Sequence, residues 1–319
     1  MVNSLLFLLL GLAGLYFGAD WLVRSAVRIA AALHVKPLFI GLTVVAFGTS
    51  APEMVVCVVA AVRGNTDIAL GNVLGSNVAN IGLILALTAV LSPVRVPHKL
   101  AQRELPFMLA ATLIFYGLAW RLSFGRLEGA LLVLALLAFT RLALHWAKKE
   151  PSAVAPKLER FPPGQEPRRR VRTGPDLALL TAGLLVLVVA SHLLVTAAVD
   201  LARRVGVSEL IVAATLVAVG SSLPELATSI VAALRKQADI VVGNLVGSNL
   251  FNILGALGLS ALVRPVRVDV SLLRFEFVAL LIFSAAMAYA LRSGHRVRRG
   301  EGGVLLVAYI GFVLGLFLR

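Results

Sequence analysis

The chain has 319 residues, of which 59% are hydrophobic and only 14% are charged. Its mean hydropathy of +0.93 excludes a soluble domain of this length, because one core could not bury so much apolar surface. The apolar stretches are about 20 residues long and predict helices that span a membrane, not the short strands of an outer-membrane barrel. The formal net charge of +14 comes from basic residues between these stretches, and no nucleic-acid partner is expected.

The apolar windows predict an all-α integral membrane protein with ten transmembrane helices. Their ranges are 3–31, 38–62, 67–92, 101–120, 126–147, 175–203, 208–234, 239–262, 272–291 and 302–318. The only cysteine, Cys57, lies inside an apolar run and can form no internal disulfide.

Basic residues alternate between the two sets of connecting segments, with 20 on one side and 9 on the other. The positive-inside rule assigns the richer side to the cytoplasm, which leaves both termini outside. A polar central segment, residues 148–174, belongs to the richer side and predicts a flexible cytoplasmic linker. It separates two predicted five-helix units, residues 1–147 and 175–319.

The two units contain related sequences at an offset of 172 residues. When residues 43–81 are aligned with 215–253, 20 of 39 positions are identical, including Glu, Asn, Ser, Pro and Gly at matched spacing. Because each unit has an odd number of spans, the second enters the membrane from the opposite side. Inverted repeats of this kind are typical of secondary transporters, whose binding site lies at the midplane between the repeats.

Two acids, Glu53 and Glu225, lie deep in apolar spans at equivalent repeat positions. An ionised carboxylate at the centre of a bilayer costs at least a few kcal/mol unless it is compensated. No Lys or Arg is available nearby in these spans. A bound metal cation is therefore the expected compensation, although interhelical hydrogen bonding is a simpler role for the polar residues around the acids.

These surrounding residues carry only oxygen ligands, which suit Na⁺, Ca²⁺ or Mg²⁺ better than Zn²⁺ or Cu²⁺. Pro52 and Pro224 interrupt their helices, so backbone carbonyls one turn before the hydroxyl groups are expected to join the site. The predicted cation ligands are Ala46, Thr49, Ser50, Glu53, Ser76, Asn80, Ala218, Ser221, Ser222, Glu225, Ser248 and Asn252.

Three other intramembrane polar residues are weaker candidates. Asp20 and Asp200 each have an arginine four residues later, Arg24 and Arg204, and are predicted to form structural ion pairs. His192 aligns with Asp20 in the repeat, and both a proton-linked role and a packing role stay open for it. Small-residue spacing in the third and eighth spans, such as Gly243 and Gly247, predicts close packing against the second and seventh.

The motifs Gly-Thr-Ser-Ala-Pro-Glu (48–53) and Gly-Ser-Ser-Leu-Pro-Glu (220–225), each followed by Gly-Asn-x-x-Gly-Ser-Asn-x-x-Asn, resemble the paired repeats of the calcium/cation antiporters. The prokaryotic sodium/calcium exchangers are the most similar branch. The resemblance implies Ca²⁺/Na⁺ antiport by alternating access at these ligands, in a prokaryotic inner membrane, with the first and sixth spans sliding as a gating pair. It implies no cofactor beyond the transported ions, and it leaves the choice between monomer and oligomer open.

Asn252 departs from the resemblance, because several exchangers have Asp at this position. Only two carboxylates remain, which balance one Ca²⁺ and put the coupling ratio in doubt. Three alternatives stay open: Ca²⁺/H⁺ antiport on the same fold, a passive cation channel, and an intramembrane hydrolase. The inverted repeat argues against a channel, and no nucleophile–His–acid set supports an enzyme.

Overall fold

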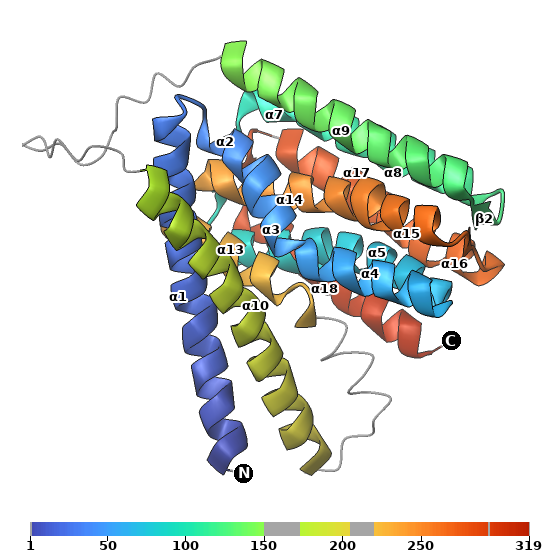
Figure 1. Ribbon diagram of the computed structural model, residues 1–319, viewed down its shortest axis with the longest axis horizontal. Coiled ribbons are helices and arrows are strands. Elements are labelled where there is room, and N and C mark those ends of the chain that lie inside the picture. The colour runs from blue at the N-terminus through green and yellow to red at the C-terminus, as the bar shows by residue number, and fades with distance from the viewer. Residues whose placement is uncertain (1, 150–172, 205–219, 293, 319) are drawn as a thin grey trace, which may run out of the picture.

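The computed structural model describes residues 2–149, 173–204, 220–292 and 294–318, and these residues are mostly helical (Figure 1). In the first half of the chain, the elements are α1 (Val2–Ala32), α2 (Pro37–Ile40), the π-helix η1 (Gly41–Val45), α3 (Ala46–Thr49), α4 (Ala51–Arg63), α5 (Thr66–Ala79), the π-helix η2 (Asn80–Leu85), α6 (Ala86–Leu91), β1 (Val94–Arg95), α7 (His98–Gln102), α8 (Glu104–Ala119), β2 (Ser123–Phe124) and α9 (Arg126–Lys149).

The described elements of the second half follow in the same order. It comprises α10 (Thr173–Arg204), α13 (Leu223–Leu234), α14 (Ala238–Leu250), the π-helix η4 (Phe251–Ala256), α15 (Leu257–Val263), β3 (Val266–Arg267), α16 (Val270–Arg274), α17 (Glu276–Arg292), β4 (Arg296–Val297) and α18 (Arg299–Phe317). Helices α9 and α10 each extend two residues into the predicted linker, 148–174.

Seven helices in the described part of the chain are long and apolar enough to cross a membrane, and the bent pair α2–α3 and α4 makes an eighth. The fourth predicted span contains α8, which has only 16 residues and follows the separate short helix α7. The first part of the seventh predicted span lies outside the described residues, which resume at Gly220. The arrangement of ten transmembrane helices in two inverted repeats therefore stays a prediction.

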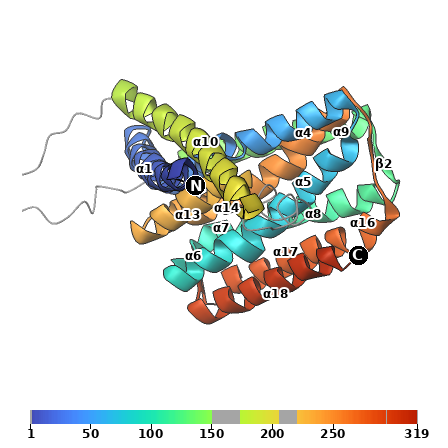
Figure 2. The same cartoon turned by 90° about the horizontal axis from the view of Figure 1, so that it is seen from below.

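The third and eighth predicted spans form the centre of the bundle. Within an apolar 18-residue stretch of each span, all residues are buried in α14–α15 and 78% are buried in α5–α6, whereas only 11% are buried in α18. Figure 2 shows α14 in the middle of the molecule and α18 at its edge. Large apolar side chains of the outer helices, such as Leu127 and Val304, are exposed, as expected for surfaces that contact lipid.

Helices α1 and α10 pack along each other and stand apart from the main bundle (Figure 1). Their backbones approach closely through glycines. A Cβ atom added to Gly18 would lie 3.0 Å from the Gly183 carbonyl oxygen, and one added to Gly183 would lie 2.8 Å from the Gly18 carbonyl oxygen. The two longest helices of the protein therefore form one tightly packed pair.

Two short antiparallel ladders join the halves at their connecting segments. Strand β1 pairs with β4, with Val94 opposite Val297, and β2 pairs with β3, with Phe124 opposite Val266. The paired valines and the phenylalanine are buried, so each ladder closes over apolar side chains.

The expected close approach at the small residues is found for the eighth span. Helix α14 packs against η1 and α3, and a Cβ atom on Gly247 would lie 2.4 Å from the Leu42 carbonyl oxygen. No described atom lies within 4 Å of a Cβ added to Gly75, the equivalent of Gly247. The residue equivalent to Leu42 is Ala214, which lies outside the described residues.

This contact generates a prediction for stability. Gly247→Ala should lower the melting temperature of the purified protein in detergent, by an amount equivalent to roughly 1–3 kcal/mol, because the added methyl group has no space. Gly303→Ala in α18 is the matched control, since no described atom lies within 4 Å of its added Cβ. Equal melting temperatures for the two variants would contradict the packing described for α14.

Candidate cation site

Glu53 and Glu225 each lie in the first turn of a helix that begins at a break. Helix α4 starts after Ser50 and α13 starts after Ser222, with a proline in the first turn of each. At the first break the chain bends by 44° between Pro37–Thr49 and Ala51–Arg63. Because the free N–H groups of a helix start carry partial positive charge, this position stabilises a carboxylate. The proline therefore both opens the helix and places the acid at its start.

The two glutamates are joined by reciprocal hydrogen bonds. The Ser50 hydroxyl donates to Glu225 Oε1 at 3.0 Å, and the Ser222 hydroxyl donates to Glu53 Oε1 at 3.2 Å. Glu53 is 1% exposed and Glu225 is 2% exposed, so neither side chain contacts lipid. The acids of the two halves thus face a shared interior.

The residues one position earlier follow the same arrangement. The Thr49 hydroxyl also lies within hydrogen-bonding range of Glu225, and that of Ser221 within range of Glu53. Thr49 is fully buried, whereas Ser221 is half-buried. Each carboxylate is therefore surrounded by hydroxyl groups from the opposite half.

The predicted ligands of the central helices are all buried, in elements that pack against the two helices with the acids. Helix η2, which begins with Asn80, packs against α13, while η4, which contains Asn252, packs against α4. Both asparagines thus lie in π-helical turns, a local distortion that often marks functional sites and that the sequence analysis missed. Ser76 and Ser248 lie four residues before them on α5 and α14 and are 5% and 0% exposed.

Several oxygen atoms in this cluster have no hydrogen-bond partner among the described residues. These atoms are Glu53 Oε2, Glu225 Oε2, Asn80 Oδ1, Ser248 Oγ and Asn252 Oδ1. Unpaired buried acceptors are costly, and two of these belong to carboxylates. A cation coordinated by the free oxygens would satisfy them, so the donor set fits the predicted ion chemistry.

Of the two backbone ligands that the sequence predicts, only Ala46 lies within the described residues. Its carbonyl oxygen keeps the α-helical hydrogen bond from the Ser50 N–H, at 3.0 Å, and lies 3.4 Å from the Thr49 hydroxyl. Its role as a cation ligand stays a prediction. Ala218 lies outside the described residues.

The carbonyl that Pro224 leaves without a helical donor is that of Gly220, and its oxygen accepts a hydrogen bond from the Ser191 hydroxyl of α10 at 2.7 Å. The sequence analysis missed this contact, which links α10 to the break before Glu225. In the first repeat the position equivalent to Ser191 is Ala19, which has no hydroxyl group. The two breaks are therefore satisfied differently.

Asn244 and its equivalent in the first repeat, Asn72, have different partners. Thr49 donates to Asn244 Oδ1 at 3.2 Å, and Asn244 Nδ2 donates to the Ser229 hydroxyl at 3.4 Å. The equivalent Asn72 donates instead to the Cys57 sulfur at 3.2 Å. Asn244 therefore helps to hold the Thr49 side chain in place.

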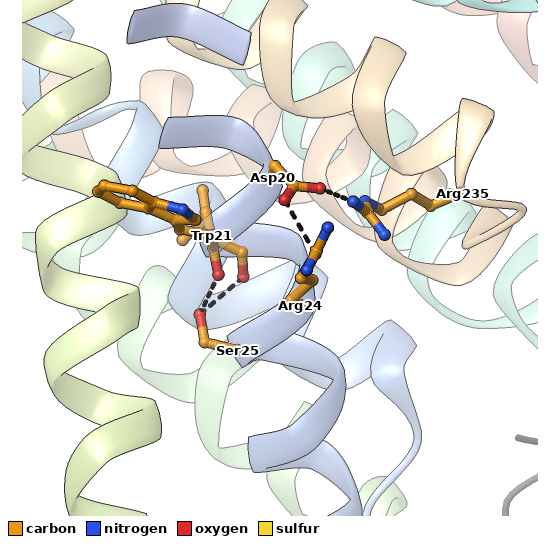
Figure 3. A network of polar contacts seen from close by, with 6 residues as sticks. Asp20, Trp21, Arg24, Ser25 and Arg235 are labelled. Carbon is orange, nitrogen blue, oxygen red and sulfur yellow. Dashed lines mark hydrogen bonds and ion pairs between the residues drawn. The ribbon is translucent and has the colours of Figure 1, made fainter. Parts of the chain in front are cut away.

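Asp20 lies outside the cluster, as expected. Figure 3 shows its carboxylate between Arg24, at 2.9 Å, and Arg235, which was not anticipated as a partner. Asp200 pairs with Arg204 at 2.8 Å, so both expected i,i+4 ion pairs are confirmed. His192, the residue equivalent to Asp20, has an exposed side chain.

No group of three or more His, Cys, Asp or Glu side chains within the described ranges could hold a metal ion. The Glu53 and Glu225 cluster instead combines two acids with hydroxyl and amide oxygens. This chemistry suits a hard cation that is bound and released.

A family model for the sodium/calcium exchanger protein matches residues 3–144 and again residues 176–318. The chain belongs to the sodium/calcium exchanger protein family. Its relatives include the putative antiporter CaxA of Alkalimonas amylolytica, 38% identical over 99% of both chains. The sodium/calcium exchanger MaX1 of Methanosarcina acetivorans is 32% identical over 98% of both chains.

A solved structure of the sodium-calcium exchanger NCX_Mj, soaked with zero Na⁺ and Ca²⁺, matches this exchanger-family chain with a TM-score of 0.84. The two sequences are 30% identical, and the match covers 99% of each chain. These named relatives are membrane transporters and not enzymes, so the intramembrane hydrolase considered above is excluded.

The Ser191 contact predicts a loss of stability. Ser191→Ala should lower the free energy of unfolding by about 1–2 kcal/mol, because the Gly220 carbonyl would lose its donor. Ser25→Ala is a matched control, since the Ser25 hydroxyl donates to the carbonyls of Trp21 and Leu22, within a continuous helix. Thermal melting in detergent measures both variants. A larger loss in Ser25→Ala would contradict a special role for Ser191.

Proposed function

We propose that the protein exchanges Ca²⁺ for Na⁺ across the membrane by alternating access at the Glu53–Glu225 site. The single observation that carries the proposal is the reciprocal arrangement in which Ser50 binds Glu225 and Ser222 binds Glu53. The names of MaX1 and NCX_Mj as sodium/calcium exchangers support the same cargo. The predicted ligand residues given above would share the coordination of the ions.

The charge of the site explains obligatory exchange. Two buried carboxylates balance one Ca²⁺, and Na⁺ has a similar radius, so both ions compete for the same oxygens. An empty site would leave two uncompensated charges in a medium of low dielectric constant, which opposes the occluded transition. Asn252 adds an amide and no third charge, so a third Na⁺ would depend on dipoles alone.

The arrangement of helices supports the inverted repeat and the gating pair. Both Ser–Glu hydrogen bonds join positions related by the offset of 172, as a two-fold axis between the repeats would require. Helix α1 packs against α13, whereas the equivalent pair α10 and α4 forms no comparable interface. Two copies of one motif thus differ in conformation, as alternating access demands. We place the central linker in the cytoplasm and both termini outside.

Removal of either charge tests the site. Glu53→Gln and Glu225→Gln should each reduce Na⁺-driven calcium uptake into proteoliposomes to background, because the remaining charge cannot balance Ca²⁺. Glu128→Gln is the matched control, since Glu128 is also a buried glutamate but pairs with Arg121 at 2.8 Å, away from the site. Wild-type uptake by either site variant, at equal amounts of reconstituted protein, would refute the role of the acids.

The coupling ion needs a separate experiment, because protons could neutralise the same two carboxylates. Radioactive calcium uptake is measured with an outward gradient of Na⁺, H⁺ or K⁺, imposed one at a time. Uptake is expected with the Na⁺ gradient at fixed pH and not with the other two. Calcium uptake driven only by the H⁺ gradient would assign the protein as a Ca²⁺/H⁺ antiporter. Calcium flux without a gradient of any of these three counter-ions would indicate a channel.

A further inference from the structure

We infer that the ion pair between Asp20 and Arg235 is a one-sided latch, which holds the gating pair α1 and α10 against the rest of the bundle at one face of the membrane. The inference rests on the alternating-access function proposed above. It concerns which of the two conformations is favoured, a preference set by residues outside the cation site.

Helices α1 and α10 are tied to each other at two well-separated places. Arg28 of α1 pairs with Asp176 of α10 at 2.9 Å, and the Ser4 hydroxyl of α1 donates to Asp200 of α10. Between these contacts the helices approach closely at Gly18 and Gly183. The pair is thus expected to move as one unit, and any contact from it to the other helices restrains both.

Arg235 provides such a contact. It directly follows α13, whereas Asp20 and Arg24 both belong to α1. Of the two ion pairs that Asp20 forms, the one with Arg235 therefore connects the gating pair to the bundle (Figure 3). The Asp20 side chain is only 7% exposed, while that of Arg235 is 33% exposed. Because the carboxylate is buried, separation from Arg235 leaves it with Arg24 alone, and this disfavours separation.

The repeat lacks the second latch that symmetry would supply. The residues equivalent to Asp20 and Arg235 are His192 and Arg63, so the arginine is retained but the acid is not. Both His192 and Arg63 are exposed, and Arg63 has no ion pair within the described ranges. Helix α10 also forms no interface with α4 comparable to that between α1 and α13.

This asymmetry sets a bias between the two conformations. The described conformation keeps the Asp20–Arg235 pair, and the opposite one must separate α1 from α13 and break it. An equivalent ion pair with Arg63 is not available at the other face, because His192 stands at the position of Asp20. The segment with Arg235 belongs to the basic, cytoplasmic set of connections. The latch therefore favours the conformation that is closed to the cytoplasm, and we expect its loss to change the conformational equilibrium about fivefold, the effect of one partly exposed ion pair.

Distance measurements between spin labels test this directly. In a Cys57→Ser background, Leu33→Cys at the end of α1 and Leu91→Cys at the end of α6 provide two exposed labelling positions. Asp20→Asn and Arg235→Gln should each lower the fraction of molecules that show the wild-type distance between the labels and raise the fraction at a second distance. The change should be equal in the two variants. The double variant should shift these fractions no further, because either change removes the same pair.

Arg63→Gln is the matched control, since this arginine holds the equivalent repeat position without an ion pair. A wild-type distribution in Arg235→Gln, or an equal shift in Arg63→Gln, would overturn the latch. If Asp20→Asn does not fold, Arg235→Gln alone decides the question, because its side chain is partly exposed. The measurement needs no transport, so its failure is distinct from failure of the exchange assay.

A converse variant should install the missing latch. His192→Asp would place an acid opposite Arg63 whenever α10 approaches α4, and should shift the distance distribution in the same direction as Asp20→Asn. The shift should disappear when Arg63→Gln is added. A shift that persists without Arg63, or no shift at all, would contradict the proposed symmetry of the two positions.

Discussion

The reciprocal hydrogen bonds between Ser50 and Glu225 and between Ser222 and Glu53 are the constraint on which the structure depends. Two carboxylates lie in the interior of an apolar bundle, where an isolated charge is strongly disfavoured. Helix starts and hydroxyl groups compensate them only in part, because one oxygen of each carboxylate keeps no partner among the described residues. The remaining compensation is the chemical basis for binding a cation.

The distortions of the central helices serve this site. A regular helix would direct its own polar groups along its axis and offer nothing to an ion. Here the proline breaks place the acids at helix starts, and the π-helical turns η2 and η4 contain the two asparagines. Apolar helices surround this irregular centre, so the polar backbone is kept away from lipid. A proline has no backbone N–H, so a carbonyl oxygen at such a break needs another donor. The Ser191 hydroxyl provides this donor for the Gly220 carbonyl.

Departures from the repeat are as informative as the repeat itself. The motif residues that face the acids are nearly unchanged between the two halves, because both halves contribute to one site. Away from the site, Asp20 and His192 differ, as do Ala19 and Ser191 and also Cys57 and Ser229. In the proposed mechanism both halves hold the cation, whereas the two faces of the membrane need not open equally easily. We propose that different residues at equivalent positions make one conformation more stable than the other.

The sequence by itself determined the membrane setting and the apolar spans that the structure describes, and it singled out the two acids, because apolar length, the cost of buried charge and a repeated polar motif are local properties of the chain. It also predicted the Asp20–Arg24 and Asp200–Arg204 pairs, whose partners are four residues apart. Only the tertiary structure decided three contacts: the hydrogen bond from Ser50 to the glutamate of the other half, the hydrogen bond from Ser191 to the Gly220 carbonyl, and the ion pair between Arg235 and Asp20. These partners are separated by 29 to 215 residues in the chain, and no local spacing rule connects them. The π-helical turns were likewise unpredictable, since they depend on how α14 and its neighbours pack.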